Sequence, residues 1–104
     1  MLVLIETTAA SKKDATELSH SLINANLAAC CQVSSPITSI YKWEGKIKEN
    51  TEYKITVKTT QNRSEAAITH IRDNHPYSCP EIIQIDVDYV DPVYLNWATF
   101  SLTD

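Results

Sequence analysis

Hydrophobic and polar residues recur along this chain in two periods, which predict strands and helices in turn. Residues 2–8 form an apolar run that ends in threonines, as expected for a short strand buried on both faces. Apolar residues then recur at helical spacing up to about Asn26. A capping box precedes them, with Ser11 as N-cap and Asp14 at the third helical position. The chain therefore opens with a strand and an amphipathic helix.

A long hairpin is predicted next. Residues 28–43 have the composition of a strand, in which Pro36 should mark a bulge or an edge because proline cannot donate a ladder hydrogen bond. Glu44-Gly45 supplies the turn, and residues 53–59 alternate between apolar and polar positions. Strands of this length extend past the area that helices can cover, and their bare edges invite pairing with another chain.

The second half of the chain repeats this order. A second capping pattern begins at Asn62 and predicts a helix that ends near Asn74. Residues 83–87 alternate, which predicts a strand with one buried face. Asp91-Pro92 then begins a short third helix, since proline is tolerated in the first helical turn.

The predicted order is strand, helix, strand, strand, helix, strand and a final helix. It indicates one α+β domain over residues 1–104, with a four-stranded antiparallel sheet and a long protruding hairpin. This is the ferredoxin-like arrangement with an extra C-terminal helix. Aromatic residues near the projecting tip add apolar area that one subunit would leave uncovered, so a closed homo-oligomer is expected.

Composition excludes several classes of function. The net charge is −4 and Arg63 and Arg72 are the only arginines, whereas nucleic-acid binding needs a basic surface. Gly45 is the only glycine, which argues against a phosphate-cradling loop. No apolar run approaches the roughly 20 residues of a membrane span. Three cysteines without a C-x-x-C pair fit a reducing compartment, so a cytoplasmic protein is expected.

Chemically active side chains are most concentrated in the segment His75–Glu81, which reads His-Pro-Tyr-Ser-Cys-Pro-Glu. Its two prolines make it stiff and non-helical. Imidazole, thiol and carboxylate groups all ligate metals, so His75, Cys79 and Glu81 are candidate ligands. The prolines disfavour closure of all three around one ion. A neighbouring strand or subunit is therefore expected to complete any site.

Each candidate also has a structural alternative. His75 can cap the end of the second helix, and Cys79 can be an inert loop thiol. Cys30 and Cys31 are adjacent on a strand, so their side chains point to opposite faces and cannot both ligate one ion within a subunit. One of the two is then expected to be a small buried hydrophobic residue.

Four separated segments carry a family resemblance. Leu-Ala-Ala-Cys at 27–30, Ser-Ile-Tyr-Lys-Trp-Glu-Gly-Lys at 39–46, the segment 75–82 and Tyr-Leu-Asn-Trp at 94–97 resemble, in order and spacing, the CutA divalent-cation tolerance family. The resemblance implies a ferredoxin-like homotrimer built by pairing hairpin strands between subunits. It also implies reversible binding of copper or other divalent cations and a role in metal tolerance, without catalysis.

The resemblance also bears on individual residues. Cys30 matches the family position and is the preferred strand ligand. Ser78 stands where the family often has an acid, and the extra thiols Cys31 and Cys79 shift any site towards soft metals such as Cu(I). The residues expected at a subunit interface or cleft are Tyr41, Trp43, Glu52, Tyr77 and Trp97.

Other functions remain open at this point. A trimeric signalling protein resembling the PII regulators would bind a small metabolite at subunit clefts. An enzyme resembling the acylphosphatases would need a backbone-rich phosphate loop and an arginine after the first strand, which the sequence lacks. Exposed thiols and imidazoles also bind Cu²⁺ without an evolved site.

Overall fold

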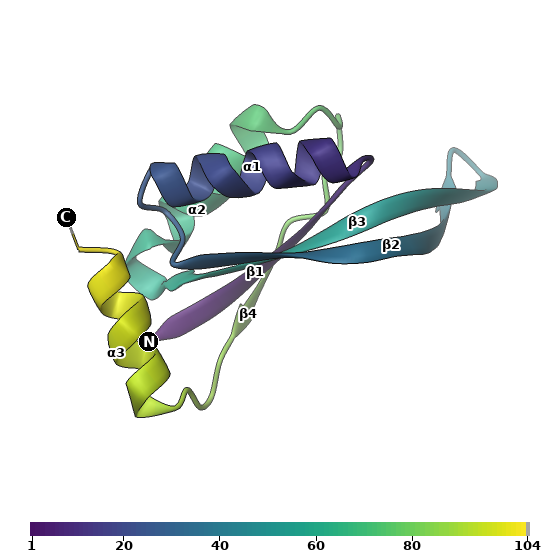
Figure 1. Cartoon of the computed structure of the whole chain (residues 1–104). Coiled ribbons are helices and arrows are strands. Elements are labelled where there is room, and N and C mark those ends of the chain that lie inside the picture. The colour runs from purple at the N-terminus through teal and green to yellow at the C-terminus, as the bar shows by residue number, and fades with distance from the viewer. Residues whose placement is uncertain (104) are drawn as a thin grey trace.

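The computed structural model describes residues 1–103, with four strands that form one antiparallel sheet in the order β2-β3-β1-β4 (Figure 1). This is the ferredoxin-like order, so the predicted α+β fold and its topology are confirmed. No helix within residues 1–103 has the length and apolar character to span a membrane. The elements are β1 (Leu2–Ala9), α1 (Lys12–Asn24), β2 (Cys30–Trp43), β3 (Lys46–Thr60), α2 (Gln61–Asn74), β4 (Ile83–Asp86) and α3 (Pro92–Ser101).

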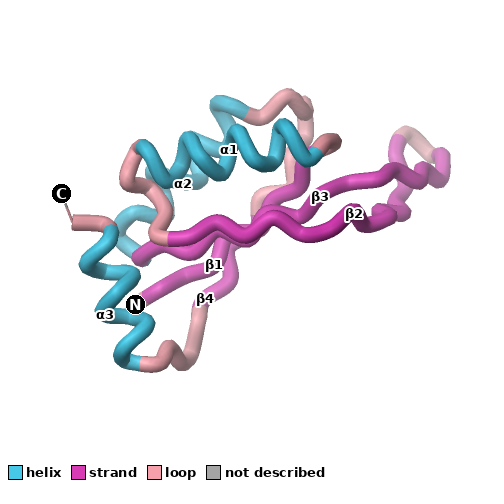
Figure 2. The backbone as a smooth tube through the Cα atoms, viewed as in Figure 1, coloured by secondary structure: helices cyan, strands magenta, loops and turns pink. Residues whose placement is uncertain are grey.

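The two long helices cover one face of the sheet, and α3 lies on the other side, near the N-terminus (Figures 1 and 2). Between the sheet and α1 and α2 lies a core in which Ile5, Leu22, Ile55 and Ile71 have no exposed surface. We call the face away from α1 and α2 the open face. Complete burial of a side chain such as Ile5 or Leu22 contributes roughly 1.5–3 kcal/mol of hydrophobic stabilisation.

The apolar side of β4 does not face this core. Ile85 pairs with Leu4 and Ile83 with Glu6, and directly opposite residues of antiparallel strands share a face. That face is the open one, where Ile83 is 49% exposed and Ile85 is 40% exposed. The predicted buried face of this strand is therefore wrong within one chain. The alternation is present, but within residues 1–103 no helix covers the apolar side of β4.

The β2–β3 hairpin projects beyond the helices and makes the molecule long, with extents of 45 × 26 × 23 Å (Figure 2). Glu44 and Gly45 form its turn with φ values of 51° and 78°. A Cβ atom at position 45 would meet nothing within 4 Å, so glycine is needed there for its backbone conformation rather than for space. The predicted turn is confirmed.

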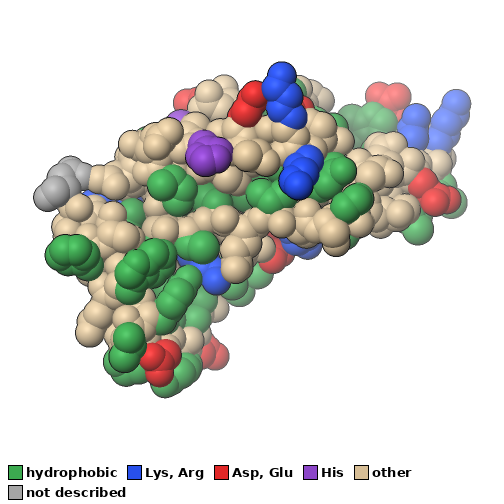
Figure 3. Space-filling model, in the orientation of Figure 1, with side chains coloured by type: hydrophobic (Ala, Val, Ile, Leu, Met, Phe, Trp, Pro, Cys, Tyr) green, Lys and Arg blue, Asp and Glu red, His purple; other side chains and the backbone are tan. Residues whose placement is uncertain are grey.

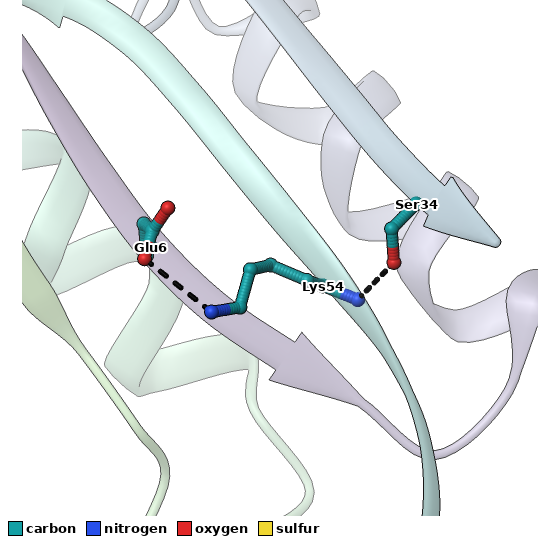
Figure 4. A network of polar contacts seen from close by, with 3 residues as sticks. All are labelled: Glu6, Ser34 and Lys54. Atoms are coloured by element: carbon teal, nitrogen blue, oxygen red, sulfur yellow. Dashed lines mark hydrogen bonds and ion pairs between the residues drawn. The ribbon is translucent and has the colours of Figure 1, made fainter. Parts of the chain in front are cut away.

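The predicted irregularity at Pro36 is also confirmed. The register of β2 against β3 shifts between Val33 and Pro36. Within the shift, the hydroxyl oxygen of Ser34 accepts a hydrogen bond from the Lys54 amide at 2.8 Å. A side chain thus replaces the missing ladder acceptor. The Lys54 Nζ atom lies 3.5 Å from Glu6 Oε1, so Lys54 connects β3 to β1 through its side chain and to β2 through its amide (Figure 4).

The cap predicted at Ser11 is confirmed, and so is the start of the third helix predicted at Asp91-Pro92. Ser11 accepts from the Asp14 amide at 3.1 Å, and Asp91 accepts from the Val93 amide at 3.1 Å. The capping pattern predicted at Asn62 is wrong, because β3 runs directly into α2 and no side chain caps it. Instead the Gln61 amide donates to the Met1 carbonyl at 3.0 Å, so the residue before β1 satisfies the first amide of this helix.

Candidate functional site

A cleft of about 1020 Å³ lies between the projecting hairpin and the loop after α2. Six of the nine predicted site residues line it, and three do not. The hairpin contributes an acid and two aromatic rings, and the loop contributes a phenol, a thiol and a second acid. The lining residues among those predicted are Tyr41, Trp43, Glu52, Tyr77, Cys79 and Glu81.

His75 fixes the position of the loop that lines the cleft. It ends α2 in an extended conformation, and its Nε2 atom lies 2.7 Å from the Thr8 carbonyl oxygen. Since a carbonyl only accepts, Nε2 carries the proton. The Tyr77 amide donates to Nδ1 at 3.2 Å, and the two rings lie 4.6 Å apart. Both ring nitrogens are thus engaged, and ligation of a metal by His75 would require one of these bonds to break.

Tyr77 links the loop to the hairpin through Glu52. Its hydroxyl donates to Glu52 Oε2 at 3.0 Å. Burial alone would raise the pKa of Glu52, but hydrogen bonds from Ser39, Thr8 and Tyr77 outweigh burial and lower it below its usual 4.5. Burial, and to a smaller extent the hydrogen bond to the Glu52 carboxylate, raises the pKa of Tyr77 to about 12. At neutral pH the cleft therefore contains an ionised Glu52 bound to a neutral phenol.

This pair predicts a measurable response to acid. Because folding lowers the pKa of Glu52, its contribution to stability is present above the unfolded value of about 4.5 and is lost as the pH falls through the folded pKa. In Tyr77→Phe we expect the Glu52 pKa to rise, since one donor to the carboxylate is gone. The Glu52 pKa is measured in each variant from the NMR chemical shift of its carboxyl carbon between pH 2 and 7. Tyr89→Phe, at a ring that is 73% exposed, is the control. Equal Glu52 pKa values in both variants would refute the link.

Cys30 lies far from the cleft of its own chain. It pairs with Lys58 on the open face, whereas Ile37 pairs with Glu52 at the cleft. Six residues of β3 separate these positions, which is about 20 Å along a strand. The adjacent Cys31 packs against the core, and burial raises the pKa of its thiol to about 12. Cys31 is therefore a protonated, structural thiol, as expected for one of the pair.

Trp97 also lies outside the cleft. It is on α3, where its ring centre is 5.5 Å from that of Tyr94, and it is 47% exposed. The Tyr94 ring in turn lies under Lys58 Nζ, 5.4 Å from the centroid. Because Lys58 belongs to the open face, the Tyr94 and Trp97 side of α3 continues that face. The role predicted for Trp97, at a subunit interface, stays a prediction.

One chain presents an incomplete set of metal ligands. Within residues 1–103, no three histidine, cysteine or acidic side chains lie close enough to hold an ion together. The same cleft is nevertheless lined by a thiol and two carboxylates, with Cys79 and Glu81 on the loop side and Glu52 on the hairpin side. Thiolate and carboxylate groups differ in the metals they prefer, with the thiolate favouring soft ions.

Two supporting residues were missed from the sequence. Thr8 and Ser39 both donate to Glu52, and both line the cleft. Ser39 could have been found by counting back from the Glu44-Gly45 turn, because that register places Ile37 opposite Glu52 and Ser39 one diagonal step away. Thr8 had no such signal, since its approach depends on how β1 pairs with β3.

The fold and the cleft together define a small ferredoxin-like α+β protein, in which the loop after α2 faces a projecting hairpin. Residues 3–101 match the family model described as CutA1 divalent ion tolerance protein, and the chain belongs to this family. The family suggested by the sequence is thus confirmed, and the chain is a member of a divalent-cation tolerance family.

Relatives and solved structures agree with this assignment. The divalent-cation tolerance protein CutA of Pectobacterium atrosepticum is 35% identical over 100 residues, covering 96% of this chain and 91% of that protein. The crystal structure of divalent ion tolerance protein CutA1 from Ehrlichia chaffeensis has a TM-score of 0.95 at 35% identity, covering 98% and 95% of the two chains. That of CutA from Xylella fastidiosa has a TM-score of 0.94 at 33% identity, covering 98% of each. These comparisons give the PII-like alternative no support.

Proposed function

We propose that this protein binds divalent cations and copper reversibly, in a cleft that a neighbouring subunit completes. One observation carries the proposal: Cys79, Glu81 and the ionised Glu52 line a single cleft, yet no three ligands converge within residues 1–103. A second copy that brings Cys30 or a further acid to this wall would complete the set. The Cys79 thiolate favours copper in its soft Cu(I) form.

A homotrimer built by pairing hairpin strands is the assembly we infer. Both edge strands, β2 and β4, have an unpaired side, and open edges favour pairing between chains. Apolar side chains on the hairpin and on β4 are exposed in the single chain, including Ile40 at 66%, Trp43 at 43% and Ile83 at 49%. Burial between subunits would cover them, and cyclic closure would leave no edge free.

We further propose that the cleft has no catalytic role and that the protein is cytoplasmic. His75 has both ring nitrogens engaged, and the Cys31 thiol stays protonated, so neither is an activated base or nucleophile. Cys30, Cys31 and Cys79 are free thiols, as is usual in a reducing compartment. In this proposal His75 orients the loop, while Cys79 and Glu81 reach the ion.

Competition with a Cu(I) chelator under anaerobic conditions tests the site. Cys79→Ser and Glu81→Gln are each expected to weaken binding about tenfold or more, the usual effect of losing a metal-site group. His20→Ala removes an exposed imidazole on α1 and is the matched control. Sedimentation of each variant checks that the assembly is intact. Wild-type affinity in both Cys79→Ser and Glu81→Gln would exclude the cleft as the copper site.

A further inference from the structure

The C-terminal part of the chain combines acidic charge with exposed apolar side chains. All nine lysines and arginines lie within residues 1–80, whereas residues 81–103 contain four acids and no basic residue. The same segment holds three of the most exposed apolar side chains, Tyr89 at 73%, Val93 at 78% and Phe100 at 78%. Large exposed apolar groups with a polar rim mark interaction surfaces.

The geometry of α3 shows that its exposed residues cannot join the core of their own chain. Ala98 and Leu102 are its buried side chains, at 0% and 2% exposure. At about 100° per residue, Val93 lies on the opposite side of the helix from Leu102, and Phe100 opposite Ala98. We call Val93 and Phe100, together with the exposed Tyr89 of the loop before α3, the outer stripe. Figure 3 shows apolar side chains gathered over α3 with acidic atoms beside them.

Acidic groups flank the outer stripe, and the nearby basic groups are held elsewhere. Asp88 and Asp91 are exposed at the N-terminal end of α3. Lys58 lies over Tyr94, on the open-face side of the helix. Arg63 donates to the carbonyl oxygens of Asn26 and Leu102, on the buried side. The field over the stripe is therefore set by carboxylates.

We infer that the outer stripe docks a basic amphipathic helix of a partner protein. Val93 and Phe100 are seven residues apart, about 10.5 Å along the axis, which matches two turns of apolar anchors on a second helix. Lysines or arginines beside those anchors would meet Asp88 and Asp91. A two-fold contact with the stripe of a second copy fits less well, because it would place the same carboxylates against one another.

The interaction is expected to be weak and reversible. Three side chains and their neighbours cover less than the roughly 1,200 Å² that stable complexes bury. A micromolar dissociation constant with clear salt dependence is therefore expected, since the charges lie at the rim. The inference does not depend on cation binding, because the outer stripe shares no residue with the cleft.

Fluorescence anisotropy of a labelled model peptide tests the inference on the full chain. The basic probe is a peptide of about 18 residues with leucine and lysine at amphipathic helical spacing, and the acidic probe has glutamate in place of lysine. The variants are Val93→Ser/Phe100→Ser and Asp88→Asn. Ile23→Ser, at an apolar side chain of α1 that is 40% exposed, is the matched control. Circular dichroism confirms the fold of each.

The expected result is micromolar binding of the basic probe to the wild type and to Ile23→Ser. Val93→Ser/Phe100→Ser should weaken it about tenfold or more, and Asp88→Asn severalfold. Equal binding of the acidic probe, no binding up to about 1 mM, or an unchanged affinity in Val93→Ser/Phe100→Ser would each overturn the inference. Sedimentation that shows self-association through the stripe, abolished in Val93→Ser/Phe100→Ser, would assign it to a second copy and also overturn it.

Discussion

Replacement of Arg63 by alanine is expected to lower the free energy of unfolding by about 3 kcal/mol. Arg63 lies in the first turn of α2, and its guanidinium donates to Asn26 O at 2.9 Å and to Leu102 O at 2.7 Å. These two carbonyls belong to the α1–β2 connection and to the end of α3. One side chain therefore ties three elements together. Hydrogen bonds from a charged donor each contribute about 1.5–3 kcal/mol, and the variant leaves both carbonyls without this donor.

Urea unfolding at equal protein concentration measures this effect. Arg72→Ala removes the other arginine, which is exposed near the end of α2, and should change stability by no more than about 0.5 kcal/mol. Arg63→Lys should fall between the two, because lysine keeps the charge but lacks the planar fork that reaches two acceptors. If Arg63→Ala were as stable as Arg72→Ala, the two hydrogen bonds of the Arg63 guanidinium would contribute nothing to the free energy of unfolding.

Replacement of His75 by alanine is expected to destabilise the metal-free protein by about 2–3 kcal/mol and to weaken copper binding about tenfold. The variant removes the donor to the Thr8 carbonyl and the acceptor of the Tyr77 amide. The loop that carries Cys79 and Glu81 would then lose its attachment to β1. Affinity falls in this account because the ligands are no longer held in place.

Two readouts separate this positioning role from direct ligation. Hydrogen exchange of the Tyr77 amide should become faster in metal-free His75→Ala, whereas loss of a ligand alone would leave it unchanged. His20→Ala, at an exposed imidazole of α1, should alter neither exchange nor stability. Wild-type stability and exchange in metal-free His75→Ala, with weakened copper binding, would identify His75 as a ligand instead.

Local chemistry predicted those features of the fold that neighbours in the sequence decide. The cap at Ser11, the Glu44-Gly45 turn and the irregularity at Pro36 depend on residues within a few positions, and all three are present. The start of α2 was misplaced because the Met1 carbonyl, about 60 positions away, satisfies the Gln61 amide. The predicted alternation of apolar and polar residues in β4 is present, but periodicity alone does not determine which face of the sheet the helices cover.

The candidate site was predictable to the same degree. The segment from His75 to Glu81 was expected to be stiff and to need a neighbour for a complete site. Its residues 77–81 line the cleft, and within residues 1–103 no three metal ligands converge there. The opposite directions of Cys30 and Cys31 follow from alternation alone. The distance from Cys30 to the cleft depends on the length and register of β2 and β3. The network around Glu52 depends on three strands at once, so no single segment encodes it.

Gly45 has a consequence for the unfolded chain as well as for the hairpin turn. An average sequence of 104 residues has about seven glycines, whereas this one has a single glycine. Each glycine replaced by a residue with a side chain restricts the unfolded backbone and stabilises the fold by roughly 0.4–1 kcal/mol where the native conformation allows it. About six fewer glycines thus correspond to roughly 2–6 kcal/mol. Part of this protein's free energy of unfolding should therefore come from the stiffness of its denatured state.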